Sequence, residues 1–152
     1  MKTRIDFSDI PKGLMSSLRA TETYTEGLGF DTALLELIRL HVSYINRCAY
    51  CIDMHYKEGL AAGETQQRLY SVTAWRETTY YSEQEKACLA WAEYITLPAD
   101  QHNEQSLFEG LLRFFDKAEI ANLTLIIIQI NAWNRLMKSF AIEAGTYQVG
   151  QH

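Results

Sequence analysis

Apolar residues recur along this chain every three or four positions, which is the spacing of the buried face of an amphipathic α-helix. Near the end of the chain, Ile120, Leu123, Ile127, Ile130 and Met137 fall on one such face. Valine, isoleucine and threonine rarely alternate with polar residues, so β-strand signals are weak throughout. The pattern predicts an all-α protein with helices over residues 11–27, 32–46, 47–62, 64–72, 82–96, 103–115 and 116–144.

Several predicted helices begin at residues that suit a helix N-terminus. Asp31 can cap the second helix with its carboxylate, and Pro11 suits the first turn of the first helix. The segments Ser82–Glu85 and Asp116–Glu119 have the spacing of a capping box, in which the first and last side chains each accept a backbone hydrogen bond. These signals fix where the chain is expected to turn into each helix.

Glycine and proline predict where the helices end. Gly63 is expected to stop the third helix and Gly145 the last one, and Pro98 closes the helix that begins near residue 82. Residues 74–78 are expected to form a connector. The seven residues after Gly145 are expected to be frayed or to lie on a partner subunit.

Composition places the chain among globular proteins. It has 152 residues, of which 47% are hydrophobic and 22% charged, and we expect a single domain over residues 1–152. The net charge of −5 and the absence of adjacent basic residues argue against a nucleic-acid partner. The strongest aliphatic run, Leu125–Ile128, is far too short to span a bilayer, and the N-terminus lacks a signal-peptide pattern. We therefore expect a cytoplasmic protein without a membrane partner.

The candidate chemistry lies in one segment with the pattern C-x-x-C-x-x-x-H, formed by Cys48, Cys51 and His55. In a helix these three side chains share a face, and Glu58 follows on the same side. A thiol reacts as its thiolate, which the positive end of the helix dipole favours near the first turn. The imidazole four residues after Cys51 can accept and return a proton, and the second thiol can convert an oxidised sulfur into a disulfide.

Spacing alone leaves other interpretations open for this segment. Cys48, Cys51 and His55 could supply three ligands to zinc, with Cys88 as the fourth, but no second C-x-x-C or H-x-x-x-H occurs. The residues could also simply pack in the core. Redox chemistry is the preferred interpretation, because a close cysteine pair in a cytosolic protein is more often redox-active than structural.

Beyond this pattern, the chain resembles the alkylhydroperoxidase D (AhpD)-like branch of the carboxymuconolactone decarboxylase family, and above all its short single-domain members. The resemblance covers roughly residues 15–145. The residues that carry it are Cys48–His55, Lys57-Glu58, Ala61–Glu64, Trp75–Thr78, Ser82-Glu83 and Ile130–Arg135. It implies an AhpD-like all-α domain of about six to seven helices that assembles into homotrimers or homohexamers.

The resemblance also implies a role for each site residue. Cys51 would attack an organic hydroperoxide, Cys48 would resolve the oxidised sulfur, and His55 would relay protons with a glutamate twelve residues before the first cysteine, which is Glu36. Helical geometry alone would have selected Glu58 as the carboxylate. We prefer Glu36, because its burial on an apolar helix is otherwise costly and would raise its pKa toward a useful relay value. The resemblance implies no metal and no bound cofactor, and an external dithiol, a lipoyl or thioredoxin-type donor, would regenerate the enzyme.

Tyr50 departs from the family pattern, in which a histidine often precedes the second cysteine. A tyrosine does not exchange protons near neutral pH as histidine does. The alternative function is therefore a redox-sensing or disulfide-exchange protein with little peroxidase turnover. A carboxymuconolactone decarboxylase-like enzyme is a further alternative, although that branch generally lacks the cysteine pair.

Overall fold

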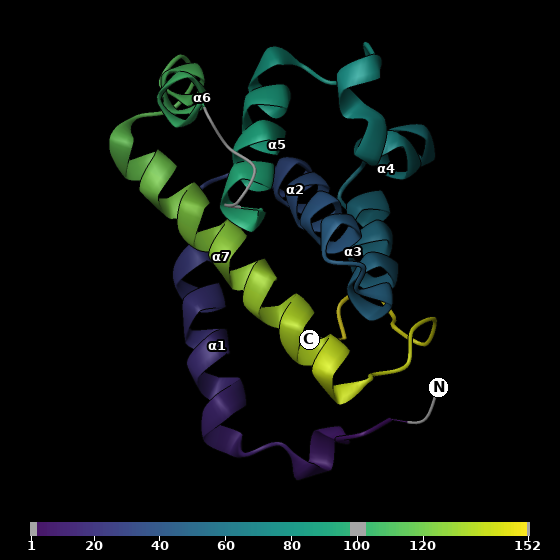
Figure 1. The fold of residues 1–152 in the computed structure, drawn as a ribbon. Helices are drawn as coiled ribbons and strands as arrows, with labels where there is room; N and C mark the ends of the chain where they lie inside the picture. Colours follow the sequence, from purple (N-terminus) through teal and green to yellow (C-terminus); the bar gives the residue numbers. More distant parts are fainter. Residues whose placement is uncertain (1–2, 98–102, 152) are drawn as a thin grey trace.

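A computed structural model describes residues 3–97 and 103–151 of the protein, and most of these residues are helical. Within those residues there are seven α-helices, two short 3-10 helices and no strand, so the all-α prediction is confirmed (Figure 1). The elements in chain order are η1 (Phe7–Asp9), α1 (Lys12–Glu26), α2 (Thr32–Ile45), α3 (Ala49–Ala61), α4 (Gln66–Ser71), η2 (Val72–Glu77), α5 (Glu83–Thr96), α6 (Glu104–Leu111) and α7 (Lys117–Phe140).

The predicted caps Asp31, Ser82 and Asp116 are present, whereas Pro11 is the N-cap residue of α1 rather than part of its first turn. Asp31 accepts hydrogen bonds from the backbone N–H groups of Ala33 and Leu34 at the start of α2. Both capping boxes form, from Ser82 to Glu85 before α5 and from Asp116 to Glu119 before α7. The side chains at these positions therefore satisfy backbone donors that a helix start would otherwise leave unpaired.

Helix α2 lies at the centre of the fold and contacts α3, α5 and α7. One apolar cluster fills the space between α2, α5, α6 and α7, and a second packs α2 against α4, η2 and α5. A third cluster surrounds the cysteine pair at the start of α3 and consists of Ile10, Cys48, Tyr50, Cys51, Met137, Phe140 and Tyr147. None of the helices within residues 3–97 and 103–151 is long and apolar enough to cross a membrane.

The structure corrects the predicted end of the last helix. Helix α7 ends at Phe140 rather than near residue 144, because Ala141 adopts a left-handed conformation with a φ of 55°. The chain then turns back, with the Ile142 N–H donating to the Met137 carbonyl oxygen. Residues 142–151 return to lie beneath α3, as the yellow segment in Figure 1 shows. They pack on their own chain, so the described residues of the tail are not frayed.

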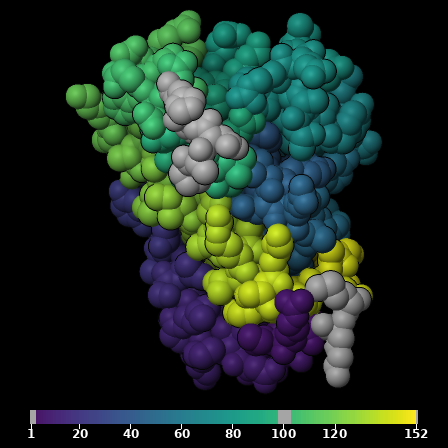
Figure 2. All heavy atoms as spheres, viewed as in Figure 1, coloured from purple at the N-terminus to yellow at the C-terminus, as the bar shows by residue number. Residues whose placement is uncertain are grey.

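Smaller corrections concern three other segments. Residues 72–77 form the 3-10 helix η2 where only a connector was expected, and α6 ends at Leu111 rather than at residue 115. Pro98, which was expected to close α5, lies outside the described residues. The two ends of the described chain meet, since the Arg4 N–H donates to the Phe140 carbonyl oxygen at 2.8 Å. Figure 2 shows the purple N-terminal residues against the yellow C-terminal ones.

A buried polar network fixes the junction between α2 and α3, directly before the cysteines. Asn134 of α7 is fully buried, and its Nδ2 donates to Ser43 Oγ at 3.1 Å. The Asn46 side-chain amide donates to Asn134 Oδ1 and to Asn131 Oδ1, both at 2.9 Å. Arg47 then adopts a positive φ of 54°, which turns the chain into α3. The network therefore attaches the entry of the cysteine helix to α7.

Replacing Asn134 with alanine is expected to lower the free energy of unfolding by about 2–3 kcal/mol, because the half-buried amide of Asn46 and the buried hydroxyl of Ser43 each lose a partner. Urea denaturation followed by circular dichroism measures the change. The matched control is Asn103→Ala, at an exposed asparagine whose side chain makes no capping hydrogen bond. It is expected to change stability by less than about 0.5 kcal/mol. Equal losses in the two variants would contradict the role of the network.

Candidate functional site

The cysteine pair lies at the first turn of α3. Cys48 is the N-cap residue, and its sulfur accepts the Cys51 backbone N–H at 3.4 Å. The two residues form a disulfide, with their Cα atoms 5.3 Å apart. Both sulfurs therefore lie at the positive end of the helix dipole, which favours the thiolate of either cysteine once the disulfide is reduced.

Glu36 of α2 lies directly against His55 of α3. Its Oε2 is 2.7 Å from His55 Nδ1, and its Oε1 accepts a hydrogen bond from Arg39 Nη1 at 2.6 Å. The carboxylate and the imidazole are both buried, at 5% and 4% exposure. The structure thus brings Glu36 to His55 from a neighbouring helix, and it places Cys51 one helical turn before that histidine.

The pKa of Glu36 differs from the sequence-based expectation. Burial on its own would raise the pKa of this carboxyl, but the charges and hydrogen bonds of His55 and Arg39 outweigh burial and lower it below its ordinary value. The expectation of a raised pKa is therefore wrong, because it took account of burial and not of the partners His55 and Arg39. Glu36 is an ionised acceptor at neutral pH, which assigns the Nδ1 proton to His55.

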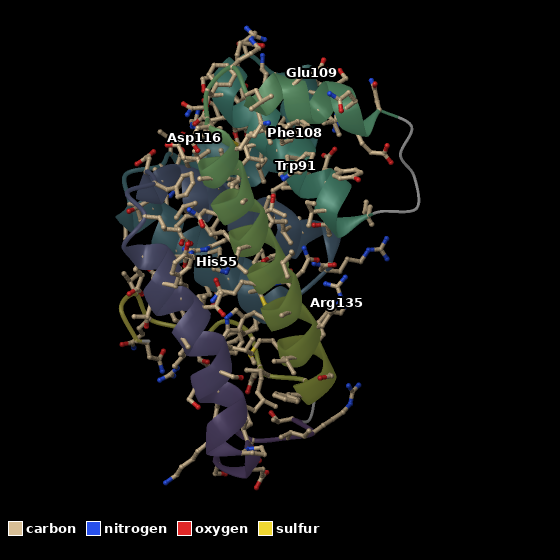
Figure 3. The ribbon with its side chains drawn as sticks, turned by 90° about the vertical axis from the view of Figure 1, so that its left-hand side faces the viewer. His55, Trp91, Phe108, Glu109, Asp116 and Arg135 are labelled. Atoms are coloured by element: carbon tan, nitrogen blue, oxygen red, sulfur yellow. A yellow bond between two sulfur atoms is a disulfide. The ribbon has the colours of Figure 1, made fainter. Side chains whose placement is uncertain are left out.

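The other ring nitrogen of His55 faces the opposite way. His55 Nε2 is buried and has no hydrogen-bond partner among the described residues. With the proton held on Nδ1, the neutral ring carries its lone pair on Nε2. This atom is therefore free to accept a proton from a thiol or a bound molecule. Figure 3 shows His55 in the space between α1 and α7.

A cavity of about 460 Å³ adjoins His55 and Cys51. Helix α1 forms one wall. Its hydrogen bonds to α7 include those from Trp133 Nε1 to Glu22 Oε1 at 2.8 Å and from Gln129 Nε2 to the Leu18 carbonyl oxygen at 3.3 Å. The cavity is mainly apolar, with the side chains Phe7, Met15, Tyr50, Met54, Ile130, Trp133, Met137 and Tyr147 on its surface. Cys51 lines this cavity, whereas Cys48 is not among the described residues that do.

Glu58 is not the carboxylate partner of His55 that helical geometry suggested. It lines the cavity, but its Oε1 accepts hydrogen bonds from the Tyr147 hydroxyl and from the Gly150 N–H. The carboxylate that meets His55 is Glu36. Sequence reasoning missed Tyr147, because no local pattern shows that the C-terminal segment returns to α3. It also missed Arg39, although its position three residues after Glu36 in a helix was a usable signal.

The remaining cysteine lies apart from the site. Cys88 is fully buried in the cluster between α2, α5, α6 and α7, where burial raises the pKa of its thiol to about 12. It therefore packs in a different cluster from Cys48 and Cys51, away from the position that a fourth zinc ligand would need. Within residues 3–97 and 103–151, no group of three or more His, Cys, Asp or Glu side chains is arranged to hold a metal ion.

A second histidine–glutamate pair, with a buried histidine and a half-buried carboxylate, lies between α2 and α5. His41 Nε2 is 2.9 Å from Glu93 Oε1, which also accepts Trp75 Nε1 at 2.9 Å, and Arg76 forms an ion pair with the same carboxylate. Burial opposes ionisation of Glu93, but these partners lower its pKa to about 2. Neither His41 nor Glu93 lines the cavity. The pair is a structural counterpart of His55 and Glu36.

Comparison with known proteins agrees with this geometry. The model of the carboxymuconolactone decarboxylase family matches residues 14–94. The uncharacterized protein YdfG of Bacillus subtilis strain 168 is 38% identical over 136 residues, which are 90% of this chain and 92% of that protein.

Solved structures share the fold. The crystal structure of a protein of unknown function from Agrobacterium tumefaciens, suggested to be an antioxidant defence protein AhpD, matches with a TM-score of 0.90 and 34% identity. The match covers 96% of this chain and 100% of that one. The debrominase Bmp8 has a TM-score of 0.77 at 18% identity, over 88% of this chain and 72% of its own. The family match, the sequence identity and the shared fold show that this chain is an AhpD-like member of the carboxymuconolactone decarboxylase family.

Proposed function

We propose that the protein is a thiol-dependent hydroperoxide reductase, in which Cys51 and Cys48 cycle between dithiol and disulfide. One observation carries the proposal: a disulfide-forming cysteine lines an apolar cavity one helical turn from a histidine that a buried carboxylate orients. A reactive thiol, a base and a binding space then meet in one place. The substrate is an organic hydroperoxide, and the reductant is an external dithiol.

The reaction takes place in three balanced steps. The Cys51 thiolate attacks the outer peroxide oxygen and the O–O bond breaks, which gives a sulfenic acid on Cys51 and an alkoxide that takes up a proton as an alcohol. The Cys48 thiolate then attacks the Cys51 sulfur, an S–S bond forms and water leaves with one further proton. Finally, a dithiol donor reduces the disulfide by exchange and is itself oxidised to its disulfide.

The positions of the two cysteines support this division of roles. Cys51 lines the cavity, so a bound peroxide reaches its sulfur, and Cys48 lies within disulfide distance behind it. His55 Nε2 accepts the Cys51 thiol proton and returns it to the leaving alkoxide, while Glu36 stabilises the imidazolium that forms between these events. The same two residues could therefore serve as base and then as acid in one turnover.

Access to the disulfide favours a slender reductant. Cys48 and Cys51 are only 1% and 3% exposed, so the flat surface of a thioredoxin-type protein does not reach them without rearrangement. A lipoyl group on a flexible arm fits the cavity better. We also propose that the protein works in the cytoplasm as a homotrimer or homohexamer, in line with the family resemblance.

A redox sensor or disulfide-exchange protein is the second candidate. The observation in its favour is Tyr50, whose raised pKa, caused by burial and by Asp53, keeps its hydroxyl protonated beside Cys51. The debrominase Bmp8 has the same fold, so the fold by itself does not select a hydroperoxide.

A thiol count tests the proposal on the protein itself. Fully reduced protein should show three thiols in denaturant, and one equivalent of cumene hydroperoxide should leave one, the buried Cys88. With excess dihydrolipoamide, hydroperoxide consumption should continue over many turnovers, measured as alcohol formed. Oxidation without sustained turnover would favour the sensor. No thiol loss with any hydroperoxide would exclude both.

A further inference from the structure

Three aromatic side chains separate the Cys51 cavity from a second, smaller cavity of about 190 Å³. Phe7, Tyr50 and Tyr147 line both spaces. The second cavity otherwise lies between the two ends of the described chain, and its remaining lining residues are Thr3, Asp6, Ile142, Glu143, Thr146 and Gln151. Side chains that face two neighbouring cavities form the partition between them.

Tyr147 is held in this partition by contacts on both its ring and its backbone. Its ring is 5% exposed and meets the Tyr50 ring edge to face, with 6.5 Å between the ring centroids and an angle of 82°. Its hydroxyl donates a hydrogen bond to Glu58, and its carbonyl oxygen accepts one from Lys57 Nζ at 2.9 Å. By contrast, Phe7 is 48% exposed on the short helix η1.

The segment around Tyr147 is attached to the same helix that carries the cysteines. Lys57 also forms an ion pair with Asp53 at 2.9 Å, and Asp53 Oδ2 accepts the Gly145 N–H at 3.1 Å. The Gly150 N–H donates to Glu58 Oε1, also at 3.1 Å. Three side chains of α3, Asp53, Lys57 and Glu58, thus hold the C-terminal segment and position Tyr147 relative to Cys51.

We propose that Tyr147 limits the size of the molecules that reach Cys51. With its ring in place the cavity ends at Tyr50 and Tyr147. Without the ring the two cavities join. A longer apolar molecule then fits into the joined space while its reactive group lies at the Cys51 sulfur. The proposal rests on the proposed function only for the identity of the natural substrate, because a size limit of this kind acts on any electrophile that meets the Cys51 thiolate.

Alkylation of Cys51 in the fully reduced protein tests this size limit. The two probes are iodoacetamide, which is small, and pyrene maleimide, which is bulky, and mass spectrometry of the Cys51 peptide gives each rate. The Tyr147→Ala variant is expected to raise the pyrene-to-iodoacetamide rate ratio by about tenfold, a typical effect of pocket size on selectivity. Tyr147→Leu should give an intermediate ratio, and Tyr147→Phe, which keeps the ring, should stay close to the unmodified protein.

Tyr70→Ala, at a 62% exposed tyrosine on α4, serves as the control and should leave the ratio unchanged. An unchanged ratio in the Tyr147→Ala and Tyr147→Leu variants would overturn the proposal, as would an equal acceleration of both probes, which indicates a loosened segment without size selection. Circular dichroism and thermal melts confirm that each variant is folded. Alkylation needs no peroxide. An absence of hydroperoxide turnover would therefore refute the proposed function, but the alkylation rates would still test the size limit set by Tyr147.

Discussion

Serine in place of Cys51 is expected to abolish the dithiol-dependent consumption of organic hydroperoxide, with a loss of roughly 1,000-fold or more, as when other enzymes lose their nucleophile. The hydroxyl of serine does not ionise at the start of α3 and forms no sulfenic acid. Steady-state alcohol formation from cumene hydroperoxide, with dihydrolipoamide as donor, measures the effect. Equal rates in Cys51→Ser and the unmodified protein would refute the role of Cys51.

Two further cysteine variants make this result specific. Cys48→Ser retains the attacking thiol but not the resolving one, so it should consume about one equivalent of hydroperoxide and accumulate a sulfenic acid that dimedone traps on Cys51. Cys88→Ala removes the thiol that packs between other helices, so turnover should continue even if stability falls. A dimedone adduct on Cys48 in the Cys51→Ser variant would instead indicate that Cys48 attacks the peroxide and Cys51 resolves the sulfenic acid.

Replacing Glu36 with glutamine is expected to lower kcat/KM for hydroperoxide by roughly 100- to 10,000-fold, the usual contribution of acid–base catalysis. Glutamine is nearly isosteric, but it removes the charge that stabilises a protonated His55 and fixes its Nδ1 proton. Stopped-flow measurement of Cys51 oxidation by hydroperoxide reports this step directly. The expected loss should appear in the oxidation rate and not in the binding of the reductant.

The second histidine–glutamate pair provides a matched control for this variant. Glu93→Gln disturbs a similar carboxylate–imidazole contact, with a more exposed carboxylate, that lies outside the cavity, so it should reduce stability and leave the oxidation rate close to normal. If both variants reduce the rate equally, the effect of Glu36 is a general loss of packing.

The dependence of stability on pH separates charge from packing in the Glu36 variant. The pKa of Glu36 is lowered in the folded protein, so its charge contributes stability above the ordinary carboxyl pKa. That contribution disappears as the pH falls through the folded-state pKa. The stability difference between the unmodified protein and Glu36→Gln should therefore be largest near neutral pH and should narrow in acid. A constant difference at all pH values would indicate lost packing alone.

Local signals accounted for most of the fold and for half of the site. The capping boxes before α5 and α7 involve residues three positions apart, and the common face of Cys48, Cys51 and His55 follows from helical periodicity alone. Each of these features depends only on neighbours within about two helical turns. Such features can be predicted before any tertiary contact is known.

The remaining features depend on contacts between distant segments. Helical geometry on its own selected Glu58, and only the family resemblance pointed to Glu36, because the approach of α2 to α3 is tertiary. The lowered pKa of Glu36 likewise required knowledge of Arg39 and His55 as its partners. The turn at Ala141 and the return of Tyr147 had no local signal, since alanine does not usually adopt a left-handed conformation.

The return of the C-terminal segment to α3 has a consequence for how the protein is made. Cys51 and Tyr147 are 96 positions apart (147 − 51), and at about 5–20 residues per second a ribosome needs roughly 5–20 s to synthesise that interval. During this time the thiols are already translated, but the Tyr147 wall does not yet exist. The size limit proposed for Cys51 therefore begins only after the segment around Tyr147 has been synthesised.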